Sequence, residues 1–265
     1  MNSRILANVA KYVALLALVG LWLYPIVLAI WKSVQVGGWS NYYDVLTHDT
    51  FNYWKAIGNS FILAVGSSLI IMLISSLGGY AFSKMVFRGR NLLYSLLLAC
   101  LAVSIASVVT PVFSTINTLG LRDTYLGVIV PMVAFNSLMM LMIMKTHFDS
   151  LPDELIEAAL LDGCGSLRIY ARILMPLSGP TLATVGVLSF VYTWNEYLLP
   201  LLLLKDPNLF PVTRAISLLQ FDRMSQQDIS TLYAGLILMT VPTLVVYLFS
   251  QKYLQAGVTA GAVKS

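Results

Sequence analysis

Six long stretches of the sequence are almost free of charged side chains, and this feature limits the folds open to the chain more than any other. They are Tyr12–Trp31, Ala56–Ser83, Asn91–Leu121, Thr124–Met144, Ile173–Leu204 and Ile229–Gln251. Only the fifth holds a charge, that of Glu196. Each reaches the roughly 20 residues that a helix needs to cross a bilayer. The pattern predicts an all-α polytopic membrane protein with six transmembrane helices.

The composition agrees with a membrane protein. Of the 265 residues, 58% are hydrophobic and 11% are charged, whereas soluble domains carry about 25% charged residues. We expect one membrane domain covering residues 1–265. The first apolar run lacks a small-residue cleavage site, so we interpret it as a retained span. The net charge of +4 is explained by basic residues flanking the spans and does not indicate nucleic-acid binding.

The distribution of Lys and Arg predicts the orientation. An even number of spans puts both termini on one side. That side would also hold residues 84–90 and 145–172, and its basic residues are Arg4, Lys11, Lys84, Arg88, Arg90, Lys145, Arg168, Arg172, Lys252 and Lys264. The other side would hold Lys32, Lys55, Arg122, Lys205, Arg214 and Arg223. Because short cytoplasmic loops are enriched in Lys and Arg, the ten against six predict cytoplasmic termini.

The segment between the fourth and fifth windows, residues 151–176, is polar and has its own helical signals. Ser150 can cap a helix, with Asp153 as a partner resembling a capping box. Ala158 and Ala159 would keep one face of this helix thin, so that another protein could approach closely. Periodicity alone favours a different interpretation, a solvated amphipathic loop between two transmembrane helices.

The second half of this segment predicts a turn and another helix. Gly163 and Gly165 should end the first helix. A second helix is expected over Ser166–Met175, and Pro176 should end it. The two helices would lie outside the membrane.

The spacing inside this segment carries a resemblance. Glu157-Ala158-Ala159 is followed by Gly163, Ile173 and Pro176, in the pattern E-A-A-x3-G-x9-I-x-M-P. The pattern resembles the cytoplasmic coupling-loop signature of importer-type ABC transporter permeases, with Met175 where Leu is usual. The residues that we assign to ATPase coupling on this basis are Glu157, Ala158, Ala159, Asp162, Gly163, Ile173 and Pro176.

Further stretches narrow the resemblance. The segment Trp194–Pro200, with sequence WNEYLLP, and the tail Thr259–Lys264, with sequence TAGAVK, are similar to MalG-type permease subunits of bacterial carbohydrate ABC importers. Asn59-Ser60 and Phe87–Arg90 match the same family. The resemblance covers nearly the whole chain.

The family implies a multi-pass subunit of the bacterial cytoplasmic (inner) membrane that works by alternating access. It implies four kinds of partner: a second, MalF-like permease, two ATP-binding subunits, an external solute-binding protein and a carbohydrate substrate. Membrane lipid surrounds such a subunit. The chain itself would be non-catalytic and hold no cofactor, because the partner subunits bind ATP and Mg²⁺. The polar external loop Lys205–Ser230 is where a substrate-delivering protein would be expected to land.

A polar group in the fifth window is a candidate translocation path. Glu196 is an ionisable residue at expected membrane depth, which is a functional-site hypothesis by default. Asn136, Tyr192 and Asn195 could add polar groups to an aqueous path. Alternatively, Glu196 lies near the outer interface or pairs structurally with a neighbouring helix.

Other site classes lack their motifs. The sequence has no Walker A motif and no H-E-x-x-H motif, and His48 and His147 are far apart, so no metal site is expected. Cys100 and Cys164 do not suggest a disulfide framework. One alternative function keeps the transporter class with a cargo such as a glycerol phosphate, polyol or uronate oligosaccharide. Another is a stand-alone secondary transporter, which should show an inverted repeat.

Overall fold

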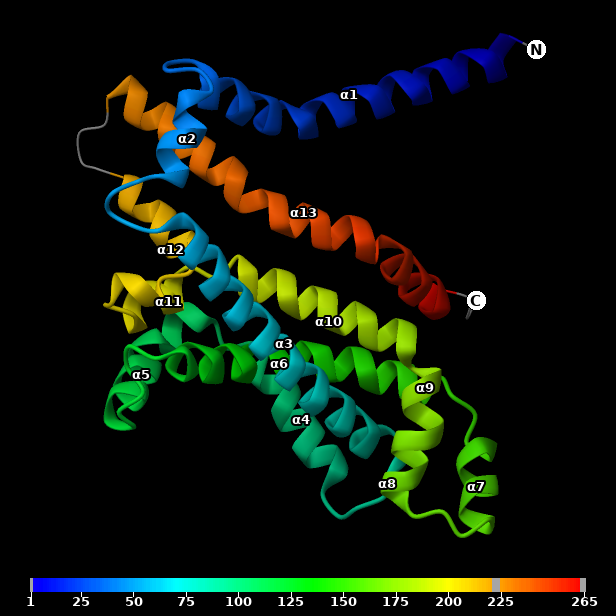
Figure 1. Ribbon diagram of the computed structural model, residues 1–265. Coiled ribbons are helices and arrows are strands. Elements are labelled where there is room, and N and C mark those ends of the chain that lie inside the picture. Colours follow the sequence, from blue (N-terminus) through cyan, green and yellow to red (C-terminus); the bar gives the residue numbers. More distant parts are fainter. Residues whose placement is uncertain (1, 221–224, 263–265) are drawn as a thin grey trace. The chain divides into compact units, whose positions relative to one another are not determined.

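The computed structural model describes residues 2–220 and 225–262, and within these ranges the chain is helical without a strand (Figure 1). The longer helices are α1 Asn2–Val34, α3 Tyr53–Lys84, α4 Arg90–Cys100, α5 Ile105–Thr118, α6 Tyr125–Asp149, α10 Gly179–Trp194 and α13 Gln226–Ala262. The shorter ones are α2 Ser40–Leu46, α7 Glu154–Leu161, α8 Ser166–Ile169, α9 Met175–Leu177, α11 Leu198–Leu203 and α12 Val212–Ile216. A π-helical turn covers Tyr170–Leu174, and 3₁₀ turns cover Pro207–Leu209 and Ser217–Leu219.

Four helices are long and apolar enough to cross a membrane unbroken: α1, α3, α6 and α13. Two further pairs qualify only as bent spans. The angle between α4 and α5 is 101°, and the angle between Ser166–Leu177 and α10 is 82°. The predicted all-α fold is confirmed, and the predicted six spans are reached when each bent pair counts as one.

The two bends fall inside charge-free windows, because the absence of charge does not distinguish a bent span from a straight one. At the first, Ser104 has extended backbone (φ −72°, ψ 139°) and separates α4 from α5. At the second, the Oγ of Ser178 donates to the Leu174 carbonyl at 2.7 Å, and Pro180 has no N–H to continue the helical ladder. Pro176, expected to end the helix, lies instead in the first turn of α9.

The chain forms two compact units, one of Met1–Trp54 with Ala215–Val241 and one of Lys55–Arg214 with Pro242–Ser265. In the first unit, the Asn41 amide fastens α2 to the end of α1. Its Nδ2 donates to the carbonyls of Ser33 and Val36, both at 2.7 Å. Its Oδ1 accepts from Nε2 of Gln227 at 2.6 Å. The predicted functional residues all lie in the second unit.

In the second unit α3 packs closely against α6 and α10. A Cβ at Gly79 would lie 2.7 Å from Cβ of Met144, and one at Gly186 would lie 2.9 Å from the sulfur of Met72. Small residues at helix crossings allow such approach in lipid, where helix association depends on packing. The tail that resembles the carbohydrate permeases, Thr259–Lys264, continues α13 as far as Ala262. Residues 263–265 lie outside the described residues.

Candidate functional site

The segment that joins α6 to α10, residues 150–178, contains the predicted coupling residues, and we call it the coupling segment. It starts differently from the prediction. Ser150 ends α6, because its Oγ donates back to the His147 carbonyl at 2.6 Å, and it does not cap the next helix. α7 begins at Glu154, with Asp153 at the N-cap position. The carboxylate of Asp153 bonds to another helix and is not used as a cap.

The end of α7 agrees with the prediction. Gly163 has a φ of +77°, the left-handed conformation that glycine adopts without steric cost. Its N–H donates to the Leu160 carbonyl at 3.0 Å, and the N–H of Cys164 donates to the Ala159 carbonyl at 2.9 Å. Such paired bonds satisfy the last carbonyls of a helix. The turn therefore closes α7 directly after Asp162.

The two alanines of α7 differ in exposure. Ala159 is buried, whereas Glu157 and Ala158 are exposed. We expected a thin face on which both alanines are accessible, and this expectation is wrong for Ala159. The exposed apolar side chains at this end are leucines, and Leu161 is 90% exposed. An apolar surface of this kind outside a membrane span indicates contact with another protein.

The second half of the coupling segment is not one regular helix. α8, the π turn and α9 follow one another, with Ile173 half-buried and Pro176 exposed. A surface depression of about 650 Å³ lies beside this run. It is lined by Gly163, Gly165, Ser166, Leu167, Arg168, Ala171 and Arg172. The side of the segment next to α7 is therefore hollowed and basic.

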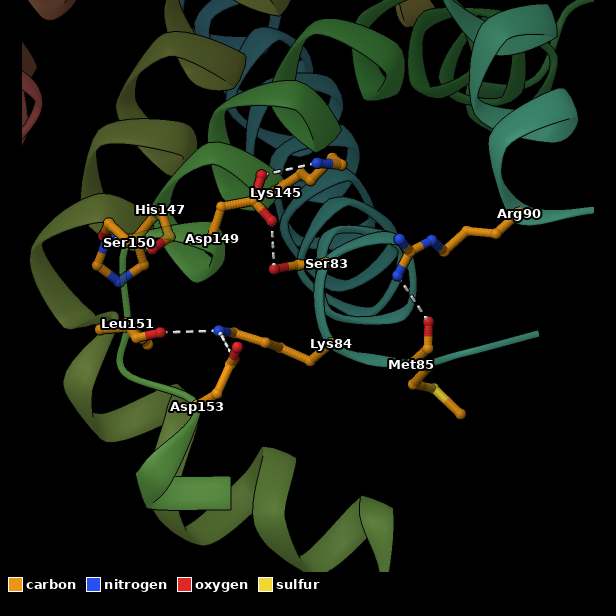
Figure 2. A network of polar contacts seen from close by, with 10 residues as sticks. All are labelled: Ser83, Lys84, Met85, Arg90, Lys145, His147, Asp149, Ser150, Leu151 and Asp153. Carbon is orange, nitrogen blue, oxygen red and sulfur yellow. Dashed lines mark hydrogen bonds and ion pairs between the residues drawn. The ribbon is translucent and has the colours of Figure 1, made fainter. Parts of the chain in front are cut away.

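The C-terminal end of α3 contacts the start of the coupling segment (Figure 2). Nζ of Lys84 donates to the Leu151 carbonyl at 2.7 Å and to Oδ1 of Asp153 at 2.5 Å. One residue earlier, Oγ of Ser83 donates to Oδ1 of Asp149 at 2.6 Å. The second Asp149 oxygen pairs with Lys145 within α6 at 2.6 Å. The contacts of Ser83 and Lys84 were not predicted, because their partners are 66 to 69 positions away in the sequence.

The same helix also contacts the end of the coupling segment. The Tyr80 hydroxyl donates to the Ser166 carbonyl at 3.2 Å. The rings of Tyr80 and Tyr170 lie 5.5 Å apart, and the Tyr170 hydroxyl is 2.8 Å from Oγ of Ser76. Ser76, Tyr80 and Lys84 follow one another at four-residue intervals, so they lie on one face of α3.

Of the four residues proposed for a translocation path, three make local hydrogen bonds: Asn136, Asn195 and Glu196. Asn136 on α6 donates to the Met132 carbonyl at 2.9 Å. Tyr192 is exposed on α10, and Asn195 ends that helix. Glu196 lies in the turn before α11, where Oε1 accepts from the Leu199 N–H at 3.1 Å. Glu196 is thus outside a continuous helix, and the assignment of these residues to a path stays a prediction.

Residues 204–213 form a loop that is held against the N-terminal end of α3. Because this stretch begins the segment that the sequence predicts to be external, we call residues 204–213 the external loop. Asn59, 3% exposed, donates to the carbonyls of Asn208 at 2.9 Å and Phe210 at 3.0 Å. Its Oδ1 accepts from the Tyr125 hydroxyl at 2.7 Å. Oγ of Ser60 accepts from the Val212 N–H at 2.8 Å. The pair Asn59-Ser60 was noted only for its resemblance, and its role in holding the loop was missed.

Asp123 holds the start of the external loop. Its Oδ1 accepts from the backbone N–H groups of Lys205 at 2.8 Å and Asp206 at 2.9 Å. These two bonds stabilise the carboxylate and lower the pKa of Asp123. The backbone of Asp123 has a φ of +57°, a left-handed conformation that is uncommon for residues other than glycine. In the described ranges no cluster of His, Cys, Asp or Glu has the makings of a metal site.

A family model described as binding-protein-dependent transport system inner membrane component matches residues 71–260. A putative ABC transporter permease from Caldicellulosiruptor sp. is 38% identical over 88% of this chain and 83% of its own length. The AraQ permease of the arabinooligosaccharides transport system of Halalkalibacterium halodurans is 32% identical over 80% of this chain and 75% of its own length. The diacetylchitobiose uptake permease NgcG of Streptomyces coelicolor is 30% identical over 80% of this chain and 70% of its own length.

A solved structure has the same fold. It is a bacterial ABC transporter involved in the import of the acidic polysaccharide alginate, and its matching chain has a TM-score of 0.79 at 24% identity. The match covers 96% of this chain and 98% of the other.

Proposed function

The chain belongs to the family of binding-protein-dependent transport system inner membrane components, and we propose that it is the permease subunit of an importer for sugars or oligosaccharides. The observation that carries this proposal is a family match that includes the coupling segment and four of the six predicted spans beyond it. Relatives at 32% and 30% identity are named for the uptake of arabinooligosaccharides and diacetylchitobiose. A secondary transporter is disfavoured by the same match.

The proposed assembly has this chain beside a second permease in the bacterial inner membrane, with both termini in the cytoplasm. Two cytoplasmic subunits bind ATP and Mg²⁺ and hydrolyse the nucleotide, and an external solute-binding protein delivers the sugar. This chain contributes half of the pathway and performs no chemistry. A binding protein is part of a solved alginate importer complex of similar fold, which supports that part of the assembly.

We propose that α7 is the contact with one ATP-binding subunit. The exposed Ala158 permits close approach of a partner, and the neighbouring exposed leucines supply apolar area to bury. Closure of the ATPase pair on ATP binding would then move α7, and the spans with it. Glu157 would lie at the rim of this contact, since its side chain is exposed in the first turn of the helix.

The cargo is the open part of this function. A neutral oligosaccharide follows from the two named relatives, and an acidic oligosaccharide is the alternative that the alginate importer raises. An uptake panel in reconstituted vesicles distinguishes them, with neutral oligosaccharides, uronate oligosaccharides and polyols as candidates. Competition by the uronates alone would replace the neutral cargo with the acidic one.

Crosslinking tests the coupling role. A cysteine replaces Ala158 in a chain whose Cys100 and Cys164 have been changed to serine, and the complex with its ATPase is treated with a short bifunctional thiol reagent with and without ATP. We expect a crosslink to the ATPase whose yield depends on nucleotide. Ala159→Cys is the matched control, because the buried neighbour should react several-fold less. An intact complex without any crosslink from Ala158→Cys would refute the role of α7.

A further inference from the structure

One unbroken helix touches both the coupling segment and the external loop. α3 runs for 32 residues from Tyr53 to Lys84, with no proline inside it. At 1.5 Å per residue it is about 48 Å long, more than the hydrocarbon thickness of a bilayer. Asn59 near one end bonds to the external loop, and Lys84 at the other end bonds to the coupling segment.

The contacts at the coupling end hold the segment on both sides of α7. Lys84 binds its entry through Leu151 and Asp153, and Tyr80 binds its exit through the Ser166 carbonyl. The Lys84 side chain is only 5% exposed. A buried ammonium group needs partners for its donors, so these bonds should persist when the segment moves. Movement of α7 therefore displaces the end of α3.

The Lys84 contact is more than a helix cap. A cation at the last residue of a helix interacts favourably with the helix dipole, and this alone would explain a lysine at that position. The Lys84 ammonium group, however, points to the next segment, where it meets a carbonyl and a carboxylate that are not part of α3 (Figure 2). Its neighbour Ser83 bonds to Asp149 of α6 instead of to the coupling segment, and so provides a natural comparison.

We propose that α3 carries the movement of the coupling segment to the external loop, with Lys84 and Tyr80 as its positioning residues. This inference rests on the proposed function, because it assumes that an ATPase moves α7. It adds which span receives the movement and where the movement arrives. Neither positioning residue touches substrate or nucleotide.

The test follows a reporter on the external loop. Lys205→Cys, whose side chain is exposed, is introduced without the native cysteines into the complete importer in lipid nanodiscs. Its labelling rate by a membrane-impermeant maleimide is measured with and without ATP, beside sugar transported per ATP hydrolysed in proteoliposomes. Lys84→Met should abolish the ATP-dependent change in labelling and lower transport per ATP by roughly tenfold. Lys84→Arg should retain both the ATP-dependent change in labelling and normal transport per ATP, because arginine keeps the positive charge and the hydrogen-bond donors.

Two matched variants separate transmission from stability. Ser83→Ala removes a bond of similar length between α3 and α6, and should leave both readouts unchanged. Tyr80→Phe removes only the hydroxyl that holds Ser166, and should lower transport per ATP in the same direction as Lys84→Met. If Lys84→Met fails to assemble, Tyr80→Phe decides the question with the same readouts. A merely structural role would lower the yield of complex and leave transport per ATP intact.

The result that overturns the inference is also distinct from failure of the proposed function. If Lys84→Met and Tyr80→Phe keep the ATP-dependent labelling change and normal transport per ATP, α3 does not transmit the movement. The nucleotide-sensitive crosslink from Ala158→Cys would persist in that case. Absence of that crosslink in a chain that keeps Lys84 and Tyr80 would instead refute the proposed role of α7, on which this inference rests.

Discussion

Gly163 is the residue at which backbone conformation alone should control coupling. Its φ is +77°, and a Cβ built there meets no atom within 4 Å. Space is therefore available, and only the left-handed backbone penalises a side chain, by about 1–2 kcal/mol. We predict that Gly163→Val lowers ATP hydrolysis stimulated by the binding protein about tenfold, while the chain still inserts into the membrane. The measurement is ATPase activity of the purified complex at matched subunit ratio.

Asparagine supplies the control at this position, because it adopts the left-handed conformation more readily than other side-chain-bearing residues. Gly163→Asn adds a side chain of comparable size but should retain most of the activity. Equal losses in the two variants would show that side-chain volume, not backbone strain, is responsible, and this explanation of the turn would have to be abandoned.

The sequence predicted this turn but not the neighbouring contacts, for a physical reason. A glycine at fixed spacing after a helix reports a local backbone requirement. The bond between Lys84 and Asp153 joins residues 69 positions apart, and sequence patterns contain no signal for such a pair. Ser150 illustrates the opposite error: it has the side chain of an N-cap, but the preceding helix takes its hydroxyl first.

At the scale of elements, the lengths of the membrane-spanning segments could be predicted from the sequence, whereas the bends within two of them could not. A charge-free window reports how many residues lipid can surround, and α3, α6 and α13 fulfil that expectation. A charge-free window does not reveal a bend, because Ser104 and Ser178, at which the two spans bend, are uncharged. The π turn before α9 could not be predicted either, since its sequence YARIL contains no glycine or proline and would fit a regular helix.

The hydrogen bonds of Asn59 and Ser60 hold the external loop against α3, and we call these bonds the clasp. The clasp leads to a prediction for the external loop. Asn59 uses both amide hydrogens and its oxygen in bonds at 2.7 to 3.0 Å. Asn59→Ala would leave two carbonyls without these donors, at a cost of about 1–3 kcal/mol for a buried unpaired group. We expect faster amide hydrogen exchange over residues 204–213 and a lower midpoint of thermal unfolding in detergent.

Lys55 provides the comparison for this clasp. Its Nζ donates to Oδ1 of Asn208 at 2.8 Å in an exposed position, where water can replace the bond. Lys55→Met should therefore change exchange in the loop much less than Asn59→Ala. Indistinguishable exchange rates in the two variants would mean that the buried amide does not hold the loop.

At the scale of the whole molecule, orientation rests on a modest charge bias that α3 makes testable. The helix is 32 residues long and longer than the bilayer core, so the segments bound at its two ends should face opposite compartments. We predict that Leu161→Cys, at a side chain 90% exposed, reacts with an impermeant maleimide only in inside-out vesicles. Lys205→Cys should react only in intact cells stripped of their outer membrane. Both variants lack Cys100 and Cys164. Labelling of both sites from one side would overturn the six-span topology, whereas labelling with the sides exchanged would reverse the orientation and place α7 out of reach of any ATP-binding subunit.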